Sequence, residues 1–199
     1  MLIRVALFHC GEPLAKEALS QELALIDSMY IGVAVIVTDL VEDVELTSPK
    51  EALEAAGHEV VAISNEGTET VKGKQGGTFP VDAAIDTIDP ASFDALLIPG
   101  GFSPDQLRTD ERYVSLTKDF LTSDRPVFAI CHGPQLFIQT GLTKDLTLTA
   151  YDSVRPDLAY AGATVKDEPV VIDETYRLIT SRNPDDLDAF NQAITEALN

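Results

Sequence analysis

The stretch that decides the fold is Pro126-Val127-Phe128-Ala129-Ile130-Cys131-His132-Gly133-Pro134. Residues 126–130 form a short apolar run, which predicts a fully buried strand. A helical pattern begins directly after this run and ends at Gly141, a residue type that often closes helices. A buried strand that turns straight into a helix is the repeating unit of a parallel α/β sheet.

The same alternation of strands and helices continues on both sides of this stretch. Apolar runs predict buried strands at 30–37, 59–64 and 94–98, and shorter strands near 146–149, 170–172 and 177–180. Helical patterns are expected from about 110 and from 183 to 198, and residues 66–80 predict a small antiparallel excursion. The pattern as a whole predicts an α/β domain with a doubly wound, mostly parallel sheet sandwiched by helices.

Capping residues suggest the limits of the helix that follows the first strand. Ser48 is a favourable N-cap, and Pro49 suits the first helical position. Residues 50–56 are rich in helix formers and precede Gly57. We therefore expect this helix to begin near Lys50 and to stop at Gly57.

The first 28 residues differ from the rest of the chain. They contain a short apolar run at 2–8 and a break at 11–13, and Met29 directly precedes the first predicted central strand. We expect a catalytic domain at 29–199 and an N-terminal arm at 1–28, which is either an appended segment or an upstream-extended start. The apolar run is too short for a secretory signal, and a small-residue cleavage site is missing.

Composition narrows the class of protein. The chain has 199 residues, with 33 Asp and Glu against 14 Lys and Arg and a formal net charge of −19. This charge argues against nucleic acids and anionic membranes as partners. No apolar run approaches the length of a membrane span, and two distant cysteines make no disulfide framework, so a cytoplasmic location is expected.

No metal or other cofactor is expected. The two cysteines and three histidines lack the spacing of a metal site, and no glycine-rich phosphate-binding motif is present.

Cys131 is the first candidate for chemistry. In a doubly wound sheet, reactive groups gather outside the carboxyl ends of the strands, where Cys131 follows a strand and precedes a helix. This is the position of a nucleophile elbow, and the helix start is expected to favour the thiolate. The alternative is a buried structural cysteine. Cys10 lies in the arm, without this context.

His132 is the candidate base because His9 is in the arm and His58 lies at the opposite edge of the sheet. Neighbouring residues at a helix start do not naturally point at one another, so His132 is expected to need a third group to orient it. The alternative is that His132 only caps the turn.

Two further segments follow strands at the same edge. Glu42 and Glu45 share a face if a helix begins there, although a solvated helix start is an equal alternative. Gly100 and Gly101 allow close approach of a ligand and offer N–H groups to an oxyanion, or they form an ordinary turn.

Four stretches together resemble the PfpI-like family, in the superfamily of the Parkinsonism-associated deglycase and the class I glutamine amidotransferases. They are 37–46, 93–101, 126–134 and 180–187. The Ala-Ile-Cys-His-Gly-Pro run at 129–134 is highly specific, and Gly-Gly-Phe-Ser-Pro-Asp-Gln-Leu-Arg at 100–108 resembles the bacterial general-stress, deglycase-type branch. The resemblance covers about 30–198 and implies a flavodoxin-like, class I glutamine amidotransferase-like fold.

The resemblance also implies roles for residues. Cys131 would be the nucleophile, His132 its partner, and Glu45 the carboxyl that hydrogen-bonds the sulfur. Gly101, next to Gly100, and the His132 backbone would hold the oxyanion, and Tyr151 would line the pocket. Asp105 matches a glutamate that, in peptidase members, comes from a neighbouring subunit, so a homo-oligomer is expected. Because no histidine follows His132, ammonia transfer from glutamine is not expected.

Three functions remain open at this stage. The favoured one is a cofactor-independent cysteine hydrolase that repairs glyoxal and methylglyoxal adducts in a stress response (a deglycase, similar to glyoxalase III). Its substrates would be small-molecule aldehydes or glycated proteins. The second is an intracellular cysteine peptidase, for which the shorter Asp105 is a departure from the family pattern. The third is a non-enzymatic stress protein or chaperone in which Cys131 senses oxidation.

Overall fold

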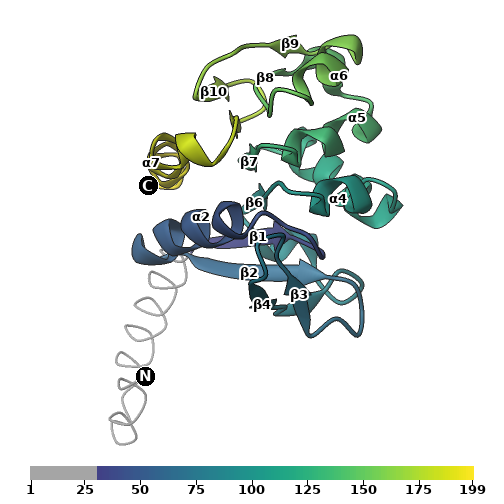
Figure 1. The fold of residues 1–199 in the computed structure, drawn as a ribbon, viewed down its shortest axis with the longest axis vertical. Helices are drawn as coiled ribbons and strands as arrows, with labels where there is room; N and C mark the ends of the chain where they lie inside the picture. Colours follow the sequence, from purple (N-terminus) through teal and green to yellow (C-terminus); the bar gives the residue numbers. More distant parts are fainter. Residues whose placement is uncertain (1–30) are drawn as a thin grey trace, which may run out of the picture. The chain divides into compact units, whose positions relative to one another are not determined.

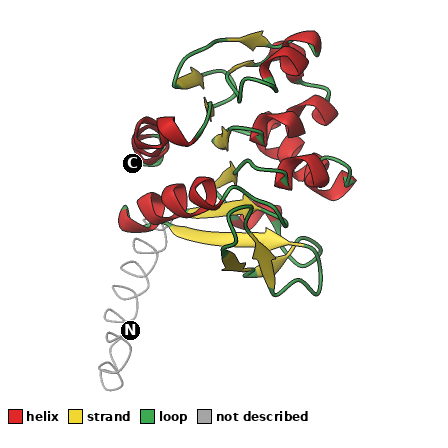
Figure 2. Ribbon diagram, viewed as in Figure 1, coloured by secondary structure: helices red, strands yellow, loops and turns green. Residues whose placement is uncertain are grey.

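A central sheet organises the part of the chain that the computed structural model describes, residues 31–199 (Figures 1 and 2). Its seven strands lie in the order β10-β11-β7-β6-β1-β2-β5, and every pairing is parallel except that of β10 with β11. The strands are β1 (Gly32–Ile36), β2 (Glu59–Ser64), β5 (Ala83–Ala84), β6 (Ala95–Ile98), β7 (Val127–Ile130), β10 (Val170–Asp173) and β11 (Leu178–Ser181). The predicted doubly wound, mostly parallel sheet is confirmed.

Two small sheets and the helices complete this unit. The small sheets are β3 (Thr70–Lys72) with β4 (Thr78–Pro80), antiparallel as expected, and β8 (Thr147–Leu148) with β9 (Thr164–Val165). The α-helices are α2 (Asp43–Ala55), α3 (Ser103–Leu107), α4 (Glu111–Thr122), α5 (Phe137–Thr140), α6 (Arg155–Tyr160) and α7 (Leu187–Glu196). Short 3-10 turns are η1 (Pro90–Ser92), η2 (Gly133–Leu136), η3 (Thr143–Asp145) and η4 (Pro184–Asp186).

Alternate residues of the central strands feed two separate cores. In β1, Val33 and Val35 pack with α2 and α7, whereas Ala34 and Ile36 pack with α4, α5 and α6. The strands β6 and β7 divide in the same way, which is the period of two expected for strands buried on both faces. In Figure 1, α2 and α7 lie to the left of these strands, with α4 and α5 to the right.

The predicted start of the first helix is wrong. α2 begins at Asp43, seven residues before Lys50, and Pro49 lies inside it. The Ser48 hydroxyl accepts a hydrogen bond from Asn191 Nδ2 at 2.7 Å, so it does not act as a cap. Burial of one helical face against the sheet and α7, which includes Pro49, outweighs the local capping signal. The predicted stop at Gly57 is confirmed by its positive φ of 97°.

The sequence patterns missed several short elements, among them α3, α6 and β5. The predicted arm at 1–28, with His9 and Cys10, lies outside the described residues. No helix within residues 31–199 is both long and apolar enough to cross a membrane.

Candidate active site

A cavity of about 380 Å³ lies where the carboxyl ends of the central strands meet. Five of the predicted site residues line it: Glu45, Gly101, Cys131, His132 and Tyr151. The other lining residues are Glu42, Lys74, Gln75, Phe102 and Pro184. The cavity therefore brings together residues that are up to 142 positions apart in the range Glu42–Pro184.

Cys131 occupies a strained turn directly after β7. Its φ is +62°, a left-handed value that non-glycine residues rarely adopt. The backbone is held from both sides, because Cys131 N donates to Ser181 O at 3.0 Å and Cys131 O accepts from Tyr151 N at 2.9 Å. A strained turn directly after a strand is what a nucleophile elbow requires, and Cys131 is 6% exposed there.

His132 contacts the cysteine directly. Its Nδ1 atom lies 3.2 Å from Cys131 Sγ, so the expectation that these neighbours do not point at one another is wrong. The positive φ of Cys131 turns the two side chains to the same side of the elbow. The group that orients the imidazole is the ring of Tyr151, stacked on it with centroids 5.0 Å apart and planes 25° apart.

Glu45 is a buried carboxyl in the first turn of α2, with no exposed surface. Gly100 N donates to its Oε2 at 3.1 Å, while Oε1 is buried without a hydrogen-bond partner among residues 31–199. The pKa of Glu45 is raised to about 7. Burial is the main cause and the charge of Glu42 adds to it, while the Cys131 thiol and the Gly100 N–H group lower the pKa. Glu45 can therefore hold or release a proton near neutral pH.

Gly100 makes room for this pairing. A Cβ at this position would collide with Glu45 Oε2 and lie 2.7 Å from Cys131 Cβ. Only a glycine lets the carboxyl and the thiol approach from opposite sides.

The thiol is less acidic than the sequence suggested. Burial raises the pKa of Cys131, and the neighbouring Glu45 raises it further, whereas the N–H groups of Gly101 and His132 lower it. The N–H groups at the turn favour the thiolate, as predicted, but a four-residue 3-10 turn follows and burial is the larger effect, so the net shift is upward. The thiolate instead requires transfer of its proton to a group nearby, and Glu45 is placed for this.

Asp105 lies on α3 and does not line the cavity. Its charge raises the pKa of His132, but burial and the charge of Lys74 lower it, and the net shift is downward. His132 is therefore a neutral imidazole at pH 7. Among residues 31–199, no carboxylate hydrogen-bonds the His132 ring.

Lys74, Gln75, Phe102 and Pro184 were not predicted as site residues. Lys74 and Gln75 lie in the turn between β3 and β4, which the sequence marked only as a glycine-rich excursion. The two glycines that flank them, Gly73 and Gly77, were the sequence signal for a close contact of this turn, since both lie against Asp43 at the start of α2.

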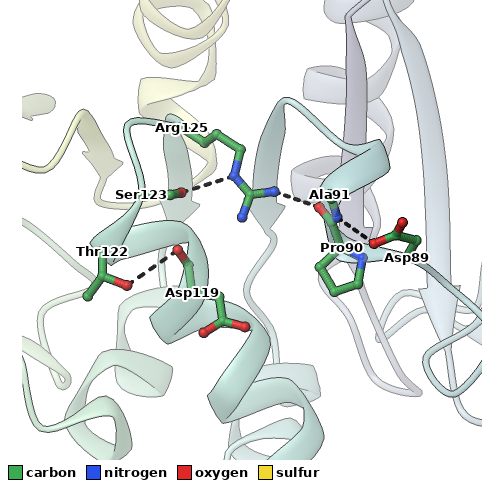
Figure 3. A pocket seen from close by; sticks show the side chains of 7 residues that line it. All are labelled: Asp89, Pro90, Ala91, Asp119, Thr122, Ser123 and Arg125. Atoms are coloured by element: carbon green, nitrogen blue, oxygen red, sulfur yellow. Dashed lines mark hydrogen bonds between the residues drawn. The ribbon is translucent and has the colours of Figure 1, made fainter.

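A second cavity, of about 580 Å³, lies near the amino ends of β6 and β7 (Figure 3). Arg125 donates there to Pro90 O at 2.6 Å and to Ser123 Oγ at 3.0 Å, and its guanidinium lies 3.8 Å from the Phe120 ring centroid. These contacts join two loops of the domain, and the lining contains no thiol or imidazole. Within residues 31–199, no group of three or more His, Cys, Asp or Glu side chains is arranged to hold a metal ion.

Comparison with known proteins places the chain in a family. Residues 32–197 match the DJ-1/PfpI family. Protein/nucleic acid deglycase 2 of Escherichia coli is 50% identical over 161 residues, and General stress protein 18 of Bacillus subtilis is 52% identical over 161 residues. Each alignment covers 80% of this chain and 93% of the relative. YraA of Bacillus subtilis, named as a candidate cysteine protease, is 52% identical over 167 residues, 84% of this chain and 96% of that protein.

Solved structures share the fold. A two-domain protein of Anabaena variabilis with DJ-1/ThiJ/PfpI-like and ferritin-like domains superimposes with a TM-score of 0.81 and 36% identity over 84% of this chain, which spans 48% of that longer protein. Drosophila melanogaster DJ-1beta superimposes with a TM-score of 0.78 and 26% identity, over 85% of this chain and 90% of its own. The resemblance expected from the four sequence stretches is confirmed. The chain belongs to the DJ-1/PfpI family.

Proposed function

We propose that this protein is a cofactor-independent cysteine hydrolase that removes glyoxal and methylglyoxal from modified cysteine, lysine and arginine side chains under stress. The observation that carries the proposal is the buried Glu45 carboxyl, with a pKa of about 7, facing the Cys131 thiol. The N–H groups of Gly101 and His132 act on the same sulfur. The names of the relatives from Escherichia coli and Bacillus subtilis, a deglycase and a general stress protein, support the same class.

The first step transfers the substrate to the enzyme. Cys131 passes its proton to Glu45, and the thiolate forms a bond to the former aldehyde carbon of the adduct. The bond from that carbon to the protein nitrogen or sulfur breaks, and the leaving group takes a proton from Glu45. The products are the repaired side chain and a hemithioacetal on Cys131.

The second step is an internal redox isomerisation. The Glu45 carboxylate removes the hydrogen of the carbon bound to sulfur, and an enediolate forms. A proton is then returned to the neighbouring carbon. The first carbon is oxidised to a thioester and the second is reduced to an alcohol, so no external oxidant or cofactor takes part. The N–H groups of Gly101 and His132, which lower the pKa of the Cys131 thiol, would stabilise the negative charge on oxygen.

The third step is hydrolysis of the thioester. Neutral His132 accepts a proton from water, which attacks the thioester carbonyl. The carbon–sulfur bond breaks, Cys131 is protonated again, and a 2-hydroxy acid leaves, lactate from methylglyoxal or glycolate from glyoxal. Free methylglyoxal can enter at the hemithioacetal stage, which is a glyoxalase activity of the same site.

The decisive experiment follows lactate formation from a preformed methylglyoxal–cysteine adduct. Cys131→Ala and Cys131→Ser are compared with wild type and with Lys118→Met, a change on the exposed face of α4. We expect both Cys131 variants to lose at least about a thousandfold in rate and Lys118→Met to match wild type. Full lactate production by Cys131→Ser would reject the proposal. A scavenger of free methylglyoxal separates adduct repair, which continues, from glyoxalase activity, which stops.

A cysteine peptidase is the second candidate. The contact of 3.2 Å between Cys131 and His132 favours it, as does the name of the relative YraA. In this case the Asp105 of a neighbouring subunit would orient His132, which requires a homo-oligomer. A strictly monomeric protein with undiminished peptidase activity would contradict this mechanism.

A further inference from the structure

One wall of the active-site cavity comes from the turn between β3 and β4, residues 73–77. The turn is closed by a hydrogen bond from Gly73 N to Gly77 O at 2.8 Å, and Lys74 N donates to Val41 O at 2.7 Å. The Asp43 carboxylate, at the start of α2, accepts from Gln75 N and from Gly77 N, both at 2.8 Å. The turn is therefore bound to the same helix start that carries Glu45.

The packing of this turn leaves no room for adjustment. A Cβ at Gly73 or at Gly77 would collide with the Asp43 carboxylate. Lys74 and Gln75 are thus presented to the cavity from a turn whose backbone is already fixed. A group held in this way loses little conformational freedom when a ligand binds.

Among residues 31–199, the ammonium group of Lys74 has one side-chain partner, Glu42. Its Nζ lies 3.1 Å from Glu42 Oε2, while Gln75 Nε2 donates to the other oxygen, Oε1, at 3.2 Å. An ammonium group has three N–H donors, and Glu42 takes one of them. The side chain of Lys74 is 46% exposed, and it is the one cation among the residues that line the cavity.

The charge of Lys74 reaches the reacting groups. Burial lowers the pKa of His132 most, and the charge of Lys74 lowers it as well. The pKa of Lys74 is raised mainly by Glu42, with smaller contributions from the charges of Cys131 and Glu45. Lys74 is therefore close enough to respond to a negative charge that appears on a ligand at Cys131.

We propose that Lys74 is a product-binding residue whose ammonium group binds the carboxylate of the 2-hydroxy acid formed at Cys131. The inference rests on the proposed function, because that reaction turns an uncharged carbonyl adduct into a carboxylate. This new charge arises in a cavity whose other ionisable side chains include Glu42 and Glu45, and in a chain with a net charge of −19. Without Lys74 the cavity would repel its product.

Glu42 is expected to affect carboxylate binding in the opposite direction to Lys74. It occupies one donor of Lys74 and places a competing negative charge beside the ligand. Removal of this charge in Glu42→Gln is expected to strengthen carboxylate binding, whereas removal of the Lys74 charge is expected to weaken it. A purely structural Lys74–Glu42 pair would make both variants weaker or leave both unchanged.

The test measures binding of lactate, with its uncharged analogue lactamide as control, to full-length Cys131→Ala by calorimetry. In this background Lys74→Met is expected to weaken lactate binding at least about tenfold, and Lys74→Arg to preserve most of it. Glu42→Gln is expected to tighten it severalfold. Lys118→Met removes one distant positive charge and is expected to change nothing. Lactamide binding is expected to be equal in all these proteins.

Each contrary result overturns the inference. No measurable lactate binding to the Cys131→Ala parent, equal lactate binding with and without Lys74, or parallel loss of lactamide binding in Lys74→Met would do so. Failure of the proposed function has a different signature. Wild type would then release no lactate from the adduct, while lactate binding by the Cys131→Ala protein would still depend on Lys74.

Discussion

The Nδ1 atom of His132 lies 3.2 Å from the Sγ atom of Cys131, although the two residues are neighbours in the chain. The contact depends on the left-handed backbone of Cys131 and on the Tyr151 ring, which stacks on the imidazole. No carboxylate within residues 31–199 hydrogen-bonds the His132 ring, so in this part of the chain the contact that holds the ring is its stacking on Tyr151.

Loss of the Tyr151 ring is expected to reduce catalysis. We predict that Tyr151→Ala lowers kcat/KM on the methylglyoxal–cysteine adduct by about threefold to tenfold, the range for one aromatic pair. Tyr151→Phe keeps the ring and should retain most of the activity. An equal loss in both variants would show that the hydroxyl, and not the stacking, is what matters.

The pH dependence of activity should report Glu45. Its pKa of about 7 means that Glu45 and Cys131 together hold two protons below this pH and one proton above it. Only the state with one proton can form the thiolate beside a neutral carboxyl, so kcat/KM is expected to rise through about pH 7. In Glu45→Gln the midpoint should move to higher pH, since burial still raises the pKa of Cys131. An unchanged midpoint in that variant would assign the titration to another group.

Glu45 should also make stability depend on pH. Its pKa is about 7 in the folded protein against 4.5 in the unfolded chain, so folding favours the protonated form. The stability that this proton provides is fully present below about pH 4.5 and is lost as the pH rises to about 7. Relative to wild type, Glu45→Gln is expected to gain about 3 kcal/mol in free energy of unfolding between pH 4 and pH 8.

Urea unfolding at several pH values measures this difference. Glu111→Gln, which changes an exposed carboxylate on α4, is the matched control and should follow wild type. A Glu45→Gln curve parallel to wild type across this range would contradict the raised pKa.

Substitution of Gly100 should separate the carboxyl from the thiol. A methyl group at this position would collide with Glu45 and crowd Cys131, so Gly100→Ala is expected to lower kcat by at least about tenfold. Gly67→Ala serves as the control for the glycine change itself, because its Cβ would contact nothing within 4 Å. Gly67→Ala should lower the free energy of unfolding by only about 1 kcal/mol, because an alanine is strained at the positive φ of this position, and should leave kcat unchanged. Wild-type kcat in Gly100→Ala, measured by lactate release, would show that Glu45 and Cys131 do not need this close approach.

Local signals were sufficient for the elements that carry most of the predicted site. An apolar run that ends at Cys131 indicates a buried strand, and the Gly100-Gly101 turn follows a run of the same kind. The rule that such strand ends meet at one edge then predicts that Cys131, Gly101 and Glu45 lie close together.

The sequence predictions were wrong or incomplete where contacts between residues far apart in the chain determine the structure. The start of α2 is set by burial of its face and not by Ser48, and the direction of the His132 ring is set by Tyr151. Lys74 escaped prediction because its position depends on Asp43, 31 positions earlier, which fixes the turn through hydrogen bonds to Gln75 and Gly77. No periodicity within 66–80 encodes such a contact.

The hydrogen bond from Cys131 N to Ser181 O has a consequence for the order of events during synthesis. A ribosome completes β7 and the elbow some fifty residues before it reaches β11, and Tyr151 N, the partner of Cys131 O, also emerges later. Until those segments have docked, the backbone of Cys131 lacks both of the contacts that hold its left-handed turn. The two hydrogen bonds that hold the left-handed turn at Cys131 can therefore form only when nearly the whole domain has been made.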